Sequence, residues 1–108
     1  MSTTERVREY LRQASLHDTR CTDVVSHLCM TERTLRAKLK RESDTTYDEL
    51  RTEERKRRCL DALAENPRTN FDRLSELCGY SDKQGAQRAF VRWFGMTLTQ
   101  WRGVNGHR

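Results

Sequence analysis

Apolar residues recur every three to four positions along most of the chain, which is the period of an amphipathic α-helix. The clearest example is the set Val7, Tyr10, Leu11 and Ala14, which lie at i, i+3, i+4 and i+7. Similar stripes occur in residues 22–28, 32–43, 46–65, 70–78 and 82–94, and a short helix is expected after residue 97. The pattern predicts an all-α chain of about seven helices.

Short polar residues mark where these helices should begin. Four of them are followed by Glu or Gln three positions later, which is the capping-box pattern. The predicted boxes are Ser2 with Glu5, Thr46 with Glu49, Ser81 with Gln84, and Thr97 with Gln100. Thr31 and Asn70 are each predicted to cap a helix alone. Gly79 and Gly95 are predicted to end helices, because glycine enters the left-handed conformation without a Cβ clash.

The chain contains an internal repeat with a spacing of 50 to 51 residues. Cys29-Met30-Thr31 matches Gly79-Tyr80-Ser81 and, after one extra residue in the second copy, matching continues to residue 102. The further matched pairs are Val24 and Leu74, Leu28 and Cys78, Leu39 and Phe90, and Arg51 and Arg102. Each copy reads helix, tight turn, helix, the arrangement of a helix-turn-helix. Within one domain of residues 1–108, we expect a first lobe at 3–45 and a second at 69–102.

A long linker helix is predicted between the lobes, over residues 46–65. Its apolar residues lie at its two ends, whereas residues 51–58 read Arg-Thr-Glu-Glu-Arg-Lys-Arg-Arg and have nothing to bury. A helix that is polar all round in its middle is typical of a solvent-bridging connector.

The charge is unevenly distributed. The formal net charge is +5; residues 1–54 hold 10 Lys or Arg against 11 Asp or Glu, and residues 55–108 hold 11 against 5. Five basic residues with no acid among them also occur in the first half: Arg33, Arg36, Lys38, Lys40 and Arg41. Basic segments of this kind favour a polyanionic partner.

The sequence gives little support for an enzyme or for a metal site. A chain of 108 residues with 34% hydrophobic content buries too little to enclose a large substrate cavity. No nucleophile with its base, carboxylate pair in a recognisable motif or glycine-rich phosphate loop occurs, so we expect no enzyme and no catalytic residues. The four cysteines lack C-x-x-C spacing and are expected to be reduced thiols. His27 with Cys29, or His17 with Cys21, could hold a metal only if the fold joined them, so no metal or cofactor is expected.

No run of eighteen apolar residues and no signal peptide is present, which predicts no membrane partner and a cytoplasmic location.

The quoted motifs resemble a known family. Met-Thr-Glu-Arg-Thr-Leu-Arg from residue 30, Gly-Tyr-Ser-Asp from residue 79, and Arg-Ala-Phe-Val-Arg-Trp-Phe-Gly-Met-Thr from residue 88 are similar to the DNA-binding domain of the AraC/XylS regulators. The resemblance covers residues 5 to 102. It implies that recognition helices at about 32–43 and 82–94 enter successive major grooves of double-stranded promoter DNA, and that the protein activates transcription through RNA polymerase. It also implies that the isolated domain is monomeric, with dimerisation through an N-terminal domain that is absent from this chain.

Matching positions supply the predicted DNA-binding residues. They are Arg33, Thr34, Arg36, Ala37 and Lys40 in the first copy, and Lys83, Gln84, Gln87, Arg88 and Arg92 in the second. Arginine can make a bidentate contact to guanine, glutamine can do so to adenine, and lysine neutralises phosphate.

Three residues depart from the family pattern. Cys29 replaces the usual glycine of the first turn, so we expect that turn to avoid a positive φ there. Ala86 replaces a bulky apolar residue, and Gly85 before it is expected in mid-helix, where it would leave the second recognition helix loosely held. The alternative function is a basic helical module that binds an acidic protein and no DNA.

Overall fold

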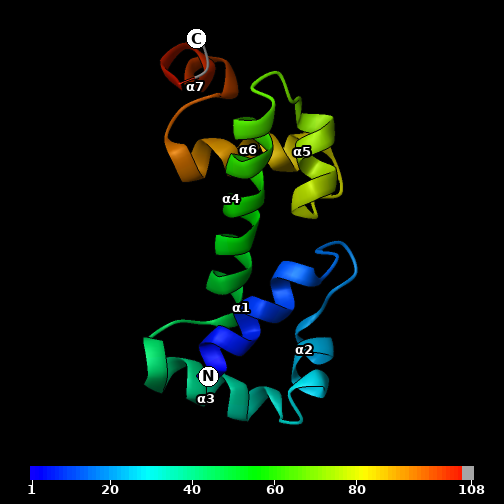
Figure 1. The fold of residues 1–108 in the computed structure, drawn as a ribbon, viewed down its shortest axis with the longest axis vertical. Coiled ribbons are helices and arrows are strands. Elements are labelled where there is room, and N and C mark those ends of the chain that lie inside the picture. Colours follow the sequence, from blue (N-terminus) through cyan, green and yellow to red (C-terminus); the bar gives the residue numbers. More distant parts are fainter. Residues whose placement is uncertain (106–108) are drawn as a thin grey trace. The chain divides into compact units, whose positions relative to one another are not determined.

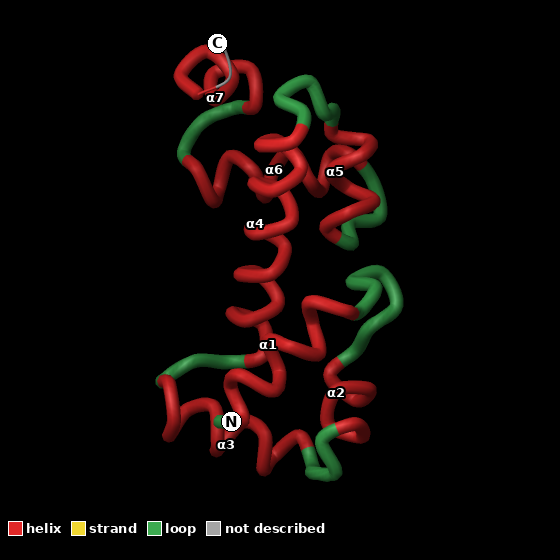
Figure 2. The backbone as a smooth tube through the Cα atoms, viewed as in Figure 1, coloured by secondary structure: helices red, strands yellow, loops and turns green. Residues whose placement is uncertain are grey.

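The computed structural model describes residues 1–105, and this range forms α-helices and no strand, which confirms the all-α prediction (Figures 1 and 2). Seven helices follow one another along the chain. They are α1 (Thr3–Gln13), α2 (Cys21–His27), α3 (Glu32–Ser43), α4 (Tyr47–Glu65), α5 (Phe71–Cys78), α6 (Lys83–Phe94) and α7 (Leu98–Asn105).

The chain divides into two compact units, Met1–Glu54 and Arg55–Arg108. Helix α4 belongs to both, because its first eight residues lie in the first unit and the rest lie in the second. Each unit therefore contains three helices of its own and one part of α4. The linker is not a separate body between two lobes.

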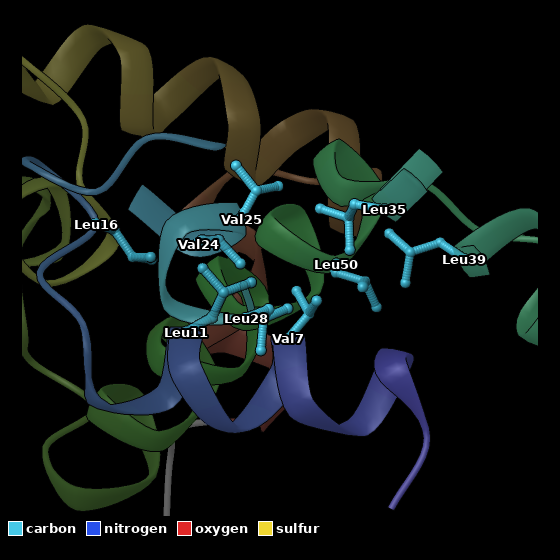
Figure 3. Packing of buried hydrophobic residues seen from close by; sticks show 9 residues of the cluster. All are labelled: Val7, Leu11, Leu16, Val24, Val25, Leu28, Leu35, Leu39 and Leu50. Carbon is cyan, nitrogen blue, oxygen red and sulfur yellow. The ribbon is translucent and has the colours of Figure 1, made fainter. Parts of the chain in front are cut away.

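Aliphatic side chains fill the core of the first unit (Figure 3). The nine buried members come from α1, the loop after it, α2, α3 and the start of α4: Val7, Leu11, Leu16, Val24, Val25, Leu28, Leu35, Leu39 and Leu50. The pairs Val7 with Leu11 and Leu35 with Leu39 are four residues apart, so each pair lies on one face of its helix. The predicted stripe of α1 is thus a core face.

The start of α1 is hydrogen-bonded to the end of α3. The backbone N–H of Thr4 donates to Glu42 Oε1 at 3.2 Å, and the hydroxyls of Thr4 and Ser43 lie 2.9 Å apart. The hydrogen bond from the Thr4 backbone lowers the pKa of the Glu42 carboxyl. These bonds fix α3 at the end away from its N-terminus.

The core of the second unit combines aromatic rings and thiols with three leucines. Its buried members are Cys59, Leu63, Leu74, Cys78, Phe90 and Leu98. The ring of Phe90 lies at the centre, with ring centroids at 4.7 Å from Phe94, 5.9 Å from Phe71 and 6.5 Å from Trp101. The tilted and edge-to-face arrangements of these rings are the favourable ones.

The two helix-turn-helix turns have the same backbone hydrogen bond. The N–H of Met30 donates to the carbonyl of Val25, and the N–H of Tyr80 donates to that of Ser75, both at 3.0 Å. Such a bond closes a helix whose next residue is left-handed. Gly79 accordingly has φ 82°, as predicted. Cys29 has φ 58°, so the expectation that its turn avoids a positive φ was wrong.

The extra residue of the second copy is Ser81, which lies in the turn. The cap of α6 is Asp82, whose carboxylate accepts the N–H of Gly85 at 2.8 Å, and the predicted Ser81 and Gln84 capping box was wrong by one residue. Thr31, Asn70 and Thr97 cap their helices as predicted.

The middle of α4 is polar but is not surrounded by solvent, which corrects the expectation that it buries nothing. Glu54 is 6% exposed, and three arginines bind backbone carbonyls at the ends of neighbouring segments. Arg51 donates to the carbonyl of Leu16 in the first unit. In the second unit, Arg55 donates to Cys78 and Arg58 donates to Leu77. Long arginine side chains can reach such carbonyls while their stems pack.

Gly85 lies in the first turn of α6, two residues after the start at Lys83, rather than in mid-helix. Its backbone N–H is the one that Asp82 caps. Ala86 is 4% exposed and Ala89 is fully buried. The expected weak point of α6 is therefore held by a cap and by two buried alanines.

Candidate nucleic-acid interface

Helix α3 turns one face to its core and leaves the opposite face open. Leu35 and Leu39 are buried, and all five predicted residues of this helix, Arg33, Thr34, Arg36, Ala37 and Lys40, are exposed. Positions 33, 36, 37 and 40 recur at i, i+3, i+4 and i+7, so they form one stripe along the helix. The structure thus brings the first set of candidates together.

The five side chains of α3 differ in how free they are to bind a ligand. Among residues 1–105, neither Arg33 nor Arg36 has an ion-pair partner. Lys40 pairs with Asp44, and the hydrogen bond to that carboxylate raises the pKa of the Lys40 ammonium. Thr34 accepts a hydrogen bond from the hydroxyl of the cap Thr31 at 3.0 Å. Arg33 and Arg36 are therefore the better placed for base edges.

Helix α6 has the same two-faced arrangement. Ala86, Ala89 and Phe90 are buried, whereas Lys83, Gln84, Gln87, Arg88 and Arg92 are all exposed. Positions 84, 88 and 92 follow one another at intervals of four, and position 87 lies beside that row. The second set of candidates is also brought together on one face.

Helix α6 differs from α3 in carrying no acid, although the two helices have the same net charge of +3 (five Lys or Arg against two Glu in α3, three against none in α6). No acid occurs between residues 83 and 94, whereas Glu32 and Glu42 stand at the ends of α3. Within the described part of the chain, Lys83, Arg88 and Arg92 have no ion-pair partner. Unpaired cations on an exposed helix attract phosphate without first breaking an internal pair.

Both helices have the capped N-terminus and the exposed polar stripe that a major groove can accept. The groove is wide enough for an α-helix, and its base edges present acceptors to arginine and both donors and acceptors to glutamine. Lys38 and Arg41, which were not among the predicted site residues, also have no ion-pair partner within residues 1–105 and extend the basic surface of α3. The run of basic residues from 33 to 41 in the sequence could have indicated that Lys38 and Arg41 belong to this surface.

The structure also joins two residues that sequence spacing did not connect. The buried Cys59 and Cys78, on α4 and α5, lie in one core cluster, and interaction with the Cys78 thiol together with burial raises the pKa of the Cys59 thiol. No group of three or more His, Cys, Asp or Glu side chains that could hold a metal ion occurs among residues 1–105. In that same range, no helix is long and apolar enough to cross a membrane.

The family model of a helix-turn-helix domain matches residues 24–103 of the chain. The matched range contains both turns and both candidate recognition helices. The chain belongs to the AraC-type helix-turn-helix family. Members of this family are DNA-binding transcription regulators, not enzymes.

A characterised relative of this AraC-type chain is the HTH-type transcriptional regulator VqsM of Pseudomonas aeruginosa. The two are 38% identical over 76 residues, which make up 70% of this chain and 23% of VqsM. The chain therefore spans about a quarter of the length of that regulator.

Two solved structures share the AraC-type fold at appreciable identity. A DNA-binding transcriptional dual regulator from Escherichia coli K-12 has a TM-score of 0.86 at 27% identity, over 100% of this chain and 96% of that one. The transcriptional regulator CdpR from Pseudomonas aeruginosa has a TM-score of 0.81 at 29% identity, over 94% of this chain and 31% of that one.

Proposed function

We propose that this chain binds double-stranded DNA sequence-specifically by inserting α3 and α6 into successive major grooves, and that it activates transcription. The observation that carries the proposal is that both units expose a basic helix face in the same way. In each unit a capped helix buries one face and exposes basic side chains on the other, and among residues 1–105 all of the proposed basic contacts except Lys40 have no ion-pair partner. The relatives named above are transcription regulators, which supports DNA as the partner.

The roles of the side chains follow from their chemistry. Arg33, Arg36 and Arg88 are the proposed guanine readers, because a guanidinium can donate two hydrogen bonds to one guanine. Gln84 and Gln87 are the proposed adenine readers. The remaining basic residues, Lys38, Lys40, Arg41, Lys83 and Arg92, are proposed to contact phosphates, which position the protein without selecting sequence.

The connection between the units supports binding by a single chain. Helix α4 has 19 residues, which correspond to about 28 Å of continuous helix. Successive major grooves on one face of B-DNA lie about 34 Å apart. We infer that one chain covers two DNA boxes about one helical turn apart, that no second copy is required, and that contact with RNA polymerase gives activation.

Selection of bound duplexes from a random pool, followed by paired substitutions, tests this function. Arg36→Ala should weaken binding to the selected site by about 1 to 3 kcal/mol and relax preference at one base pair. Lys40→Ala is the matched control on the same face, since its ammonium already pairs with Asp44. It should weaken specific and random duplexes about equally.

The proposal fails if selection yields no enriched sequence, or if Arg36→Ala lowers affinity equally on all duplexes. Retention of an acidic protein at a salt concentration that releases every duplex would instead favour the protein-interaction module. Transcription from a promoter bearing the selected site, with purified RNA polymerase, should rise on addition of the chain; a fall would contradict activation.

A further inference from the structure

One large apolar side chain of α6 is left exposed on the same side as the candidate base contacts. Val91 is 45% exposed, and it is the one exposed large apolar residue that the described part of α6 contains. Positions 84, 87, 88 and 91 recur at i, i+3, i+4 and i+7. Val91 therefore extends the stripe of Gln84, Gln87 and Arg88 along the helix.

Val91 also lines a surface groove of about 560 Å³ in the second unit. The apolar part of the groove is formed by Val91, by Phe71 at the start of α5 and by Leu98 at the start of α7. Gln87 and Arg88, which are proposed to read bases, line the groove as well. Among residues 1–105, no acid lines it. An anionic partner can therefore enter without repulsion from its walls.

The first unit has a charged residue at the position of Val91. Because Leu39 and Phe90 are repeat partners, the next residues, Lys40 and Val91, also match. The ammonium of Lys40 is exposed and pairs with Asp44. The outer face of this fold thus accepts a long charged side chain at this position. Packing of the helix does not require valine there.

The chemistry of the groove favours DNA as its occupant. Within residues 1–105, Lys83, Arg88 and Arg92 of the same helix have no ion-pair partner, so this surface attracts a polyanion. A purely apolar partner would instead remove the Arg88 guanidinium from water, which is costly. The apolar group that the major groove of DNA offers is the 5-methyl group of thymine.

We propose that Val91 selects thymine by contact with its 5-methyl group at the edge of this groove. The inference rests on the proposed function and makes Val91 a specificity-determining residue beside Gln87 and Arg88. Phe71 and Leu98 supply the rest of the apolar wall. Cytosine at the same place has no methyl group and would turn its amino group toward an apolar surface, so thymine is preferred.

Deoxyuridine isolates the contact, because it lacks only the 5-methyl group of thymidine and pairs with adenine in the same way. Each thymine of the selected duplex is replaced in turn, and affinity is measured for the chain and for Val91→Ala. The chain should lose about four-fold at one position, the factor expected for burial of one methyl group. In Val91→Ala that loss should shrink to less than about two-fold, because most of the apolar contact is gone.

Two further variants show whether the effect belongs to this side chain. Val104→Ala is the matched control, since Val104 is 72% exposed on α7 and does not line the groove. It should keep the whole deoxyuridine effect. Val91→Lys introduces the residue of the first unit and should remove the preference for thymine while it raises affinity for random duplexes, because it adds a cation. Val91 and Val104 are both exposed, so these variants should melt as the parent chain does.

Absence of a deoxyuridine effect at every thymine, or an effect of equal size in Val91→Ala, would overturn the inference and leave the proposed function intact. Stimulation of RNA polymerase that is lost in Val91→Ala while all duplexes bind as before would assign the groove to a protein partner and overturn the thymine contact. If selection enriches no duplex, the proposed function fails and the thymine contact fails with it.

Discussion

The two units have the same backbone frame but fill and close it differently. In the first unit, two helix ends adopt the left-handed conformation at Cys29, φ 58°, and Asp44, φ 49°. In the second unit, the matching positions are Gly79, φ 82°, and Gly95, φ 70°. A side chain at positive φ costs about 1 to 2 kcal/mol, and aspartate tolerates it better than most. The turn geometry is therefore maintained even where the residue does not favour it.

Each unit also has one arginine that binds backbone carbonyls of a loop, at matching positions of the repeat. Arg51 donates to the carbonyl of Leu16 at 2.9 Å, and its repeat partner Arg102 donates to those of Pro67 and Thr69, both at 2.6 Å. Each guanidinium thus holds the loop before the second helix of its unit. Backbone hydrogen bonds and their arginine anchors recur between the units, whereas the core changes from aliphatic to aromatic. The shared frame holds α3 and α6, the helices that we propose to enter the DNA, and the exposed side chains on each helix can differ.

The largest predicted effect sharpens the contrast between the cores. Phe90→Ala should destabilise the second unit by about 3 to 5 kcal/mol, because it removes the ring that contacts Phe71, Phe94 and Trp101. Urea unfolding followed by tryptophan fluorescence measures this unit alone, since Trp93 and Trp101 both lie in it. Phe90→Leu, which introduces the first unit's residue, should cost less than half as much. Equal losses for the two variants would mean that the ring contacts add nothing beyond volume.

Removal of Arg102, which holds the loop before α5, should destabilise the second unit by less than Phe90→Ala does. Arg102→Ala should destabilise that unit by about 2 kcal/mol, because it leaves two carbonyls without their charged donor. Arg51→Ala, which removes one such bond, should destabilise the first unit by about half of this amount. Amide hydrogen exchange measures the stability of that unit. A larger loss at Arg51 than at Arg102 would break the equivalence of the two anchors.

The turn can be tested by exchanging its residues. Cys29→Gly should stabilise the first unit by about 1 kcal/mol, because glycine relieves the positive φ. Gly79→Ala is the mirror change and should destabilise the second unit by a similar amount. Hydrogen exchange of α2 amides and tryptophan fluorescence report the two units. A destabilising Cys29→Gly would mean that this thiol makes a contact that outweighs the strain.

The smallest effect concerns the first turn of α6. Gly85→Ala should stabilise the second unit by at most about 1 kcal/mol, since alanine loses less backbone entropy in a helix. An added Cβ would lie 3.5 Å from Asp82 Oδ1 and from the Tyr80 ring, which is ordinary contact. Thermal melting measures the change, and Asp82→Ala, which removes the cap, should move the midpoint the other way. A lower midpoint for Gly85→Ala would show that this space is not available.

Helix positions could be read from the sequence because apolar spacing and caps are local. Thr31 and Thr97 have no second capping residue directly beside them. Ser81 and Asp82 are adjacent and both can cap, so only the length of the turn decides between them. The recognition faces were also accessible, because Leu35 and Leu39 define the buried side of α3 and thereby the open one.

Other features depend on distances between helices, which no local pattern contains. The burial of Cys59 and Cys78 in one core cluster requires α5 to pack on α4, and the spacing of the two cysteines in the sequence gives no sign of this packing. The sequence predicts a solvent-exposed middle for α4 because arginine and glutamate are polar. In the structure, however, Arg55 donates a hydrogen bond to the carbonyl of Cys78 at the end of α5. The φ of Cys29 is set by the turn's backbone bonds and not by the preference of cysteine.

The most direct test of binding by two units of one chain is footprinting on the selected site and on a version with about five base pairs inserted between its boxes. The insertion turns one groove to the opposite side of the duplex, and bending the DNA to compensate costs several kcal/mol, in the range of about 1 to 6. The account predicts protection of both boxes on the original site, with affinity on the inserted site reduced to that of a single unit. Unchanged affinity with both boxes protected would contradict it.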